Sequence, residues 1–463
     1  MLNNAILVIR IEIRMDKTGS RLVDYVFAAP RTLSDATVHE CKRRIIDTFA
    51  CAFGGYKDPV SITARSFSDR HHVASGPVIW GQSKPCTEED AAFANGVMLR
   101  VLDLSDTYLS KSRGHPSDVM AGIMAVAEAE SSSGLEVIRA VTLAYDVYCS
   151  FCDALDINTK GWDQPVYSVI ATSMGIGQLL GFDREQLRNT LGLALVPNMA
   201  MYQTRMGQLS AWKGCASANA SRNAIFAARL VQNGMTGPAE PFEGKSGLFS
   251  IVGEFDWQFP AKGEHKINQT HMKCFPICYH GQSSAWAALE ARKSVSVPDI
   301  REIKVATYRQ AVAMMGADAS RWAPESKETA DHSLPFVVAT ALQHGEINSS
   351  SFVPARLVDR AIRDIMAKVK VEEDAGLSDG YPDTAGCRLS INCGSAAPLV
   401  IDVKYPKGHV NLPMEDQQVD AKFTDLFLQF GSARKAGDIL KQLWSLEKLE
   451  RFGDLTAALP SKP

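Results

Sequence analysis

The chain has 463 residues, 46% of them hydrophobic and 22% charged, so it can bury a large core without disulfide staples. Its 49 Lys and Arg residues against 52 Asp and Glu residues give a net charge of −3, which argues against binding to nucleic acid or to an anionic membrane. The 10 cysteines lie mostly among apolar residues, as expected for reduced thiols in a cytoplasmic protein.

Residues 1–15 are predicted to be an N-terminal extension ahead of the folded body. Their apolar run, Ala5–Ile9, is too short for a membrane anchor, and the charges of Arg10, Glu12 and Arg14 interrupt the residues after it. We therefore expect neither a signal peptide nor a transmembrane segment.

From about residue 20 to residue 270 the apolar residues recur with the period of a helix. In 34–55, Ser34 is the predicted N-cap, and Gly54 and Gly55 end the pattern. A helix at 183–195 opens with Asp183 and has Gln186 three residues later, the arrangement of a capping box. The other helices are expected at 88–102, 117–129, 135–150, 165–180 and 211–232.

The pattern changes after about residue 272, where short alternating stretches rich in β-branched residues predict strands. These strands are expected at 300–308, 365–371, 387–393 and 398–405, with helices at 280–293, 333–344 and 352–364 between them. From Pro413, which we place near a first helical position, the chain is helical again. The prediction is a mostly α protein, with a large all-helical domain from both chain ends (16–271 and 412–463) and a smaller α+β lid domain (272–411).

Three motifs suggest cofactor or metal chemistry, and each has a simpler interpretation. "GIGQLLG" at 175–181 lacks a preceding strand and dinucleotide-loop spacing, so we expect a packed helix that ends at Gly181. Cys149 and Cys152 fall within a predicted helix and are expected in the core. Cys274, Cys278 and His280 would make only half of a zinc site, so neither a metal nor another cofactor is predicted.

The stretch "LDLSDTYLSKSRGHPSD" at 102–118 is the first candidate for a site. Asp103 and Thr107 are four residues apart at a predicted helix end, so we expect them to share a face. His115 directly precedes the next helix, whose free N–H groups near Ser117 could bind a carboxylate beside a titratable imidazole. The alternative is a polar loop with Asp103 and Ser117 as caps.

Two further stretches place cationic side chains near small residues or a domain junction. In "LSAWKGCASANASRNAIFAARL" (209–230), Lys213 stands at a predicted helix start, although a lone lysine there is usually solvated. In "HMKCFPICYHGQSSAWAALEA" (271–291), Lys273 and His280 flank a proline where the two proposed domains meet. Ligands often bind at such junctions, although a hinge with a surface lysine is the alternative.

These three stretches, together with "ADHSLPFVVATAL" (330–342) and "YPKGHVNLPM" (405–414), resemble blocks of the MmgE/PrpD family, and the resemblance covers about 20–455. It implies a helical domain with a smaller lid, usually in a homodimer, and a small di- or tricarboxylate substrate. It also implies that the site is lined by Asp103, Thr107, His115, Lys213, Lys273 and His280. Many relatives carry a histidine in the segment where this chain has Asp163 and Gln164.

The resemblance is closest to the 2-methylcitrate dehydratase type, which implies a hydro-lyase. We expect a metal-free reaction in which Asp103 or His115 removes a proton and the other, or Lys213, protonates the leaving hydroxyl. Thr107, Lys273 and His280 are expected to bind substrate. The alternatives are decarboxylation of cis-aconitate, another family reaction such as epimerisation, and a catalytically inactive carboxylate-binding protein.

Overall fold

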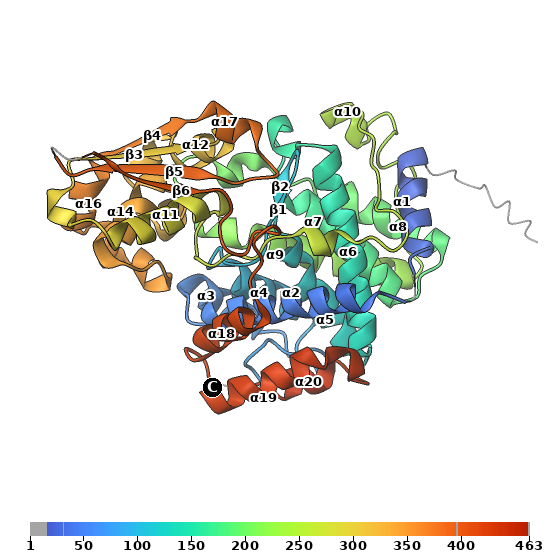
Figure 1. Ribbon diagram of the computed structural model, residues 1–463. Coiled ribbons are helices and arrows are strands. Elements are labelled where there is room, and N and C mark those ends of the chain that lie inside the picture. Colours follow the sequence, from blue (N-terminus) through green and yellow to red (C-terminus); the bar gives the residue numbers. More distant parts are fainter. Residues whose placement is uncertain (1–15, 31, 395–396, 462–463) are drawn as a thin grey trace, which may run out of the picture.

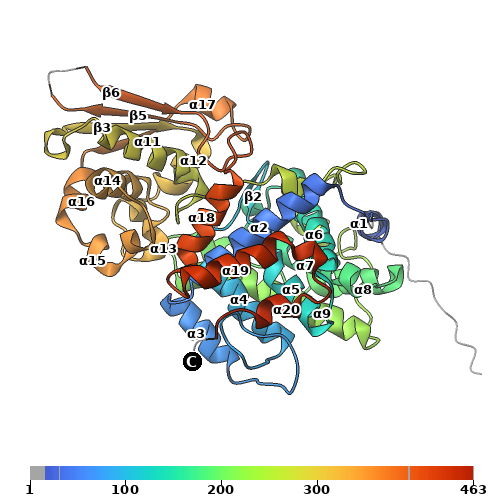
Figure 2. The same ribbon diagram turned by 60° about the horizontal axis from the view of Figure 1, so that its bottom comes forward.

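The computed structural model describes residues 16–30, 32–394 and 397–461, and its elements confirm the predicted fold class, mostly helical with a small mixed sheet. Figures 1 and 2 show a body of helices on one side and, on the other, the sheet together with helices such as α11, α14 and α16. The extension 1–15 lies outside the described residues. Among the described helices, none has both the length and the apolar character needed to cross a membrane.

The first half of the chain is a set of helices packed on one another. The element bounds are α1 (Lys17–Phe27), α2 (Asp35–Gly54), α3 (Pro59–Ser68), α4 (Glu88–Arg100), α5 (Met120–Ala129), α6 (Gly134–Ala154), α7 (Pro165–Leu179), α8 (Arg184–Leu195), α9 (Ala216–Gln232) and α10 (Leu248–Val252). Helix α7 is buried along almost its whole length and packs against α6, α8 and α9. A short hairpin, β1 (Tyr108–Leu109) with β2 (Arg113–Gly114), comes after α4.

Local signals at helix ends account for several of these bounds. The Ser34 hydroxyl accepts a hydrogen bond from the Thr37 amide at the start of α2, and α2 ends at the expected glycines. Asp183 and Gln186 form the predicted capping box of α8. Gly181 adopts a left-handed φ of 66° just after α7, a conformation that favours glycine.

The second half of the chain adds one four-stranded sheet in the order β4-β3-β5-β6. Its strands are β3 (Glu302–Thr307), β4 (Val369–Glu373), β5 (Cys387–Asn392) and β6 (Leu399–Val403); β3 and β4 are parallel and the other pairs antiparallel. The strand expected to begin at 365 begins at Val369, because Ile365 and Met366 belong to the preceding helix. The helices between the strands are α11 (Gln282–Arg292), α12 (Arg309–Met315), α13 (Lys327–Ala330), α14 (Leu334–His344), α15 (Pro354–Leu357), α16 (Arg360–Met366) and α17 (Ala375–Asp379).

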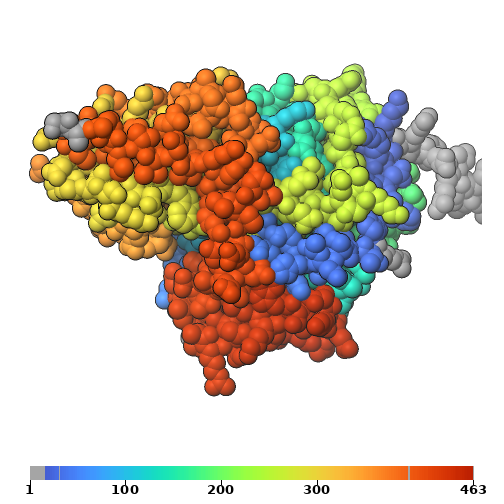
Figure 3. All heavy atoms as spheres, viewed as in Figure 1, coloured from blue at the N-terminus to red at the C-terminus, as the bar shows by residue number. Residues whose placement is uncertain are grey.

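After the sheet the chain returns to the helical side with α18 (Asp416–Phe427), α19 (Ala433–Trp444) and α20 (Gly453–Ala457). Helix α18 packs along α2, so the two ends of the chain build one body, as the red and blue segments of Figures 2 and 3 show. Pro413 precedes the helix instead of opening it. The Glu415–Gln418 capping box starts α18 at Asp416.

Two large hydrophobic clusters are built from residues of different parts of the chain. One contains residues between Leu22 and Met272 together with residues from Met414 to Leu459, and the other contains residues between Phe275 and Ile391. This separation supports the division into 16–271 plus 412–463 and 272–411, which we keep as a proposal. In Figure 3 the second segment forms a yellow and orange lobe beside the helical body.

The contact between α6 and the C-terminal segment can be tested at Gly134, whose amide donates to the Leu449 carbonyl at 2.9 Å. A Cβ at this position would lie 1.8 Å from the Leu446 carbonyl oxygen, so Gly134→Ala should destabilise the protein by about 1–3 kcal/mol. The matched control is Gly437→Ala in α19, where a Cβ has nothing within 4 Å and the helix should gain stability. Thermal unfolding measures both, and an unchanged Tm for Gly134→Ala would contradict the packing.

Candidate active site

A small cavity of about 50 Å³ is lined by residues from the α4–α5 connection, from 158–213 and from 273–332. Its wall contains all six residues that the sequence indicated: Asp103, Thr107, His115, Lys213, Lys273 and His280. The fold therefore brings together side chains that are up to 177 positions apart (280 − 103) in the sequence. The role of each residue follows from the contacts of its side chain.

The expected placement of Asp103 and Thr107 on one helix face is wrong. Helix α4 ends at Arg100, and Asp103 adopts a left-handed φ of 48° in the turn after it. Such a conformation is uncommon outside glycine, although a short polar side chain such as Asp tolerates it. Thr107 is extended, and its backbone exchanges two hydrogen bonds with His271, at 2.8 and 2.7 Å.

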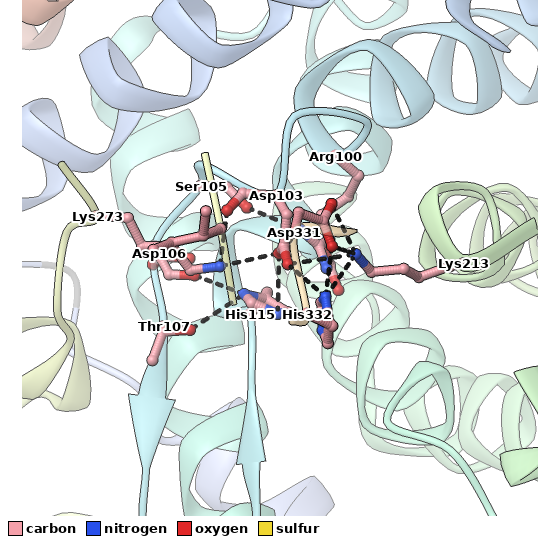
Figure 4. A network of polar contacts seen from close by, with 12 residues as sticks. Arg100, Asp103, Ser105, Asp106, Thr107, His115, Lys213, Lys273, Asp331 and His332 are labelled. Carbon is pink, nitrogen blue, oxygen red and sulfur yellow. Dashed lines mark hydrogen bonds and ion pairs between the residues drawn. The ribbon is translucent and has the colours of Figure 1, made fainter. Parts of the chain in front are cut away.

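Asp103 lies at the centre of a buried cluster of charges (Figure 4). Its Oδ1 accepts from Lys273 Nζ at 2.8 Å and from Arg100 Nη1 at 3.0 Å, and its Oδ2 is 3.4 Å from Lys213 Nζ. Burial opposes ionisation, yet Lys213, Lys273 and Arg100 together hold the pKa of Asp103 well below its usual range. The carboxylate is therefore charged at neutral pH and weakly basic.

Lys213 is buried, with 5% of its surface exposed, so the alternative of a solvated lysine is wrong. It lies in a 3-10 turn, Ala211–Gly214, just before α9. Its Nζ donates to Asp331 at 2.9 and 3.1 Å and lies 3.1 Å from His332 Nδ1. Lys273 is fully buried as well and also donates to the backbone carbonyl of Asp103 at 2.8 Å.

His115 has a defined tautomer because its Nδ1 lies 2.7 Å from the Asp106 carbonyl oxygen, which can only accept. Nδ1 therefore carries the proton and is also 3.2 Å from the Thr107 hydroxyl, while Nε2 keeps its lone pair, 3.9 Å from Asp103 Oδ1. Burial, with the positive charges of Arg100 and Lys273, holds the pKa of His115 well below its usual value. The ring is a neutral base at pH 7.

The N–H groups near Ser117 do not offer the expected substrate site. The Ser117 amide donates to Asp106 Oδ1 at 3.0 Å, and the other Asp106 oxygen accepts from the Tyr145 hydroxyl at 2.8 Å. Asp106 thus fills this helix start itself and fixes the carbonyl that orients His115. Asp118 pairs with Arg100 at 3.2 Å, so both acids make structural contacts.

His280 stands in a 3-10 turn, Tyr279–Gly281, ahead of α11. Its Nδ1 lies 2.7 Å from the Tyr308 hydroxyl, and its Nε2 is buried without a hydrogen-bond partner among the described residues. Burial, and then the charge of Arg113, lowers the pKa of His280 well below its usual value. A neutral imidazole with one unsatisfied nitrogen in the cavity is suited to a ligand contact.

The sequence reasoning missed several residues of the site, above all His332, which lines the cavity, and Asp331 next to it. Asp331 lies beside Lys213, and His332 is in hydrogen-bond contact with Asp331. Burial raises the pKa of the Cys278 thiol, but His332 and Lys273 outweigh it and lower that pKa overall. The sequence feature that could have revealed Asp331 and His332 is their position as an Asp-His pair directly before Ser333, the N-cap of α14, in a block that resembles the family.

Only Asp103, Asp331 and His332, among the described residues, place three possible metal-ligand atoms within 4.8 Å of one another. Lys213 Nζ lies 2.9 to 3.4 Å from an atom of each, so an ammonium already supplies positive charge to all three. A divalent cation in the same place would meet that charge. The alternative of a zinc site at Cys274, Cys278 and His280 is not among the groups that the described residues form.

Asp163 lies in the segment where the family resemblance implied a histidine, and it forms an ion pair. Asp163 accepts from Arg205 Nε at 3.0 and 3.2 Å, and Arg205 Nη1 donates to the backbone carbonyl of Lys213 at 3.3 Å. Asp163 and Gln164 both line the cavity. The pair therefore supports the turn that carries Lys213, and the segment 158–169 contains no histidine.

Comparison with known proteins gives matches that span most of the chain. The chain is 25% identical over 422 residues to a 2-methylcitrate dehydratase of Cupriavidus necator, covering 84% of this chain and 85% of that protein. It is 25% identical over 425 residues to a mitochondrial 2-methylcitrate dehydratase of Yarrowia lipolytica (85% and 80%) and over 434 residues to an alkylcitrate dehydratase of a fungal species (84% and 84%). The models of the MmgE/PrpD N-terminal and C-terminal domains match residues 20–259 and 275–446, and the chain therefore belongs to the MmgE/PrpD family.

Proposed function

We propose that this protein is a metal-free hydro-lyase that dehydrates a small tricarboxylate of the 2-methylcitrate type. The observation that carries the proposal is the combination of buried cations with a neutral histidine, His115, whose free Nε2 lines the same cavity. Cations bind carboxylates and stabilise the charge that develops when a proton leaves the adjacent carbon. The dehydratase names of the relatives support the same reaction class.

His115 is the better base of the two candidates. Asp103 accepts hydrogen bonds from three cationic side chains, which makes its carboxylate reluctant to take a proton. His115 Nε2 is also unprotonated, but none of these cations donates a hydrogen bond to it among the described residues. The Asp106 carbonyl and the Thr107 hydroxyl hold the far side of the ring. We therefore assign proton removal to His115 and the positioning of the cations to Asp103.

The leaving hydroxyl needs a proton, and we propose Lys213 Nζ as its donor. The carbon–hydrogen electron pair forms the new alkene bond as the proton moves to His115 Nε2, and the carbon–oxygen bond breaks. The hydroxyl takes a proton from Lys213 and leaves as water, and exchange with solvent restores both side chains. Lys273, His280 and Thr107 are proposed to hold the substrate.

A homodimer in the cytoplasm is proposed on the family resemblance alone.

A turnover assay on the purified protein tests the reaction class. We expect 2-methylcitrate or citrate to give the absorbance of a new alkene with no added metal and no loss of activity in a chelator. Itaconate formed from cis-aconitate would indicate decarboxylation instead, and inversion without alkene would indicate epimerisation. Binding without turnover of any di- or tricarboxylate would leave only a carboxylate-binding role.

His115→Gln should lower kcat about 10²–10⁴-fold, because it removes the base, while far-UV circular dichroism and Tm remain those of a folded protein. The control His72→Gln changes an exposed histidine and should keep full activity. In the wild-type protein, the acidic limb of kcat/KM should lie below pH 6.5, since His115 must lose its proton to act and its pKa is lowered. Full activity of His115→Gln would rule out this base.

Asp103→Asn separates a positioning role from a base role. Removing the charge leaves buried cations uncompensated, so we expect a loss of about 3–5 kcal/mol in the free energy of unfolding at neutral pH. The folded-state pKa lies below the unfolded value of about 3.9, so the carboxylate stabilises the fold above that pH and less as the pH falls through the folded pKa. The stability gap to wild type should therefore shrink in acid.

Denaturant unfolding as a function of pH measures this gap. The exposed Asp425 offers the matched substitution, Asp425→Asn, which should leave the unfolding midpoint unchanged across the same pH range. Unchanged stability of Asp103→Asn together with a large fall in kcat would indicate that Asp103, and not His115, is the base.

A further inference from the structure

The cations that line the cavity differ in whether the protein itself neutralises them. Four of the five are already paired with carboxylates of the chain. These pairs are Arg100–Asp118, Lys213–Asp331, Lys273–Asp103 and Arg205–Asp163. The fifth, Arg113, has no carboxylate within ion-pair distance among the residues 16–30, 32–394 and 397–461.

The contacts that Arg113 does make are weak. Its Nη2 lies 3.4 Å from the Tyr202 hydroxyl and 3.0 Å from Met314 Sδ, a neutral oxygen and a sulfur that is a poor acceptor. A guanidinium has five N–H donors in a planar fork that matches a carboxylate. Asp156 lines a neighbouring hollow together with Arg113 but does not form an ion pair with it. A half-buried guanidinium with these contacts still has N–H donors that match a carboxylate.

The hairpin places Arg113 on the same wall as the proposed base. Arg113 and His115 are two residues apart in an extended segment, so their side chains lie on one side of it. Gly114 between them faces Tyr148, whose hydroxyl would be 2.2 Å from a Cβ, so no side chain fits there. His280, with its unpartnered Nε2, lines the same cavity. A ligand that reaches His115 can thus reach Arg113 and His280 as well.

We propose that Arg113 binds one carboxylate of the substrate and thereby selects tricarboxylates over dicarboxylates that lack that group. The inference rests on the proposed function for the identity of the substrate. Arg113 also lines the adjoining hollow of about 370 Å³, so an entering anion meets it beside the cavity. The paired lysines then receive the carboxylates that lie closer to the reacting carbon.

Binding of unreactive ligands tests this without turnover. Calorimetry would use tricarballylate and two dicarboxylates: glutarate, which lacks its central carboxylate, and 2-methylsuccinate, which lacks a terminal one. Arg113→Met should weaken the binding of tricarballylate about tenfold or more. The affinity for one of the two dicarboxylates should stay within about twofold of the wild-type value. Arg113→Lys keeps the charge but loses the fork and should show a smaller loss.

The matched control is Arg360→Met, because the Arg360 side chain is 93% exposed and tests for a general effect of charge. Equal weakening of all three ligands by Arg113→Met, or no weakening of any, would overturn the proposal. Tm values of both Arg113 variants show whether they fold, and Arg113→Lys carries the test if the methionine variant does not. Selective binding without dehydration would refute the proposed function but support the Arg113 subsite. Dehydration without selective binding would support the proposed function but refute the subsite.

Discussion

The carboxylate of Asp103 allows three cationic side chains to share one buried cavity. Isolated charges of this kind are costly to remove from water, and the cluster is tolerable because Lys213, Lys273 and Arg100 meet anions in a hydrogen-bonded network. The same arrangement fixes the chemistry of the groups around it. It keeps Asp103 ionised, surrounds His115 with positive charge so that the ring stays neutral, and holds ammonium groups where a substrate anion would lie.

The fold supplies this cluster from four separate places in the chain. The turn after α4 gives Asp103, a 3-10 turn before α9 gives Lys213, the segment ahead of α11 gives Lys273, and the C-cap of α13 gives Asp331. None of the four lies within an α-helix, and in turns and connections the backbone can adopt the conformations that a converging site needs. Loops held by a rigid scaffold are common places for binding and catalytic groups.

Periodicity and capping predicted most helices and the positions of all four strands of the sheet, because these signals are local. The α2 and α8 caps are examples, as is the glycine after α7. The geometry of Asp103 and Thr107 could not be predicted in this way, since no glycine or proline marks the end of α4 at Arg100. Asp331 and His332 were missed because their role depends on Lys213, which is more than 100 residues away; Arg113 could have been found from its alternation with His115 around Gly114.

The size of the cavity has a consequence for the rate of binding. Its volume of about 50 Å³ has room for a few water molecules but not for a tricarboxylate. For a tricarboxylate to be held within this volume, part of the wall has to move outward as it binds. The measured affinity of a ligand is then the product of contact strength and the fraction of molecules that are open, and its association rate levels off at the rate of opening.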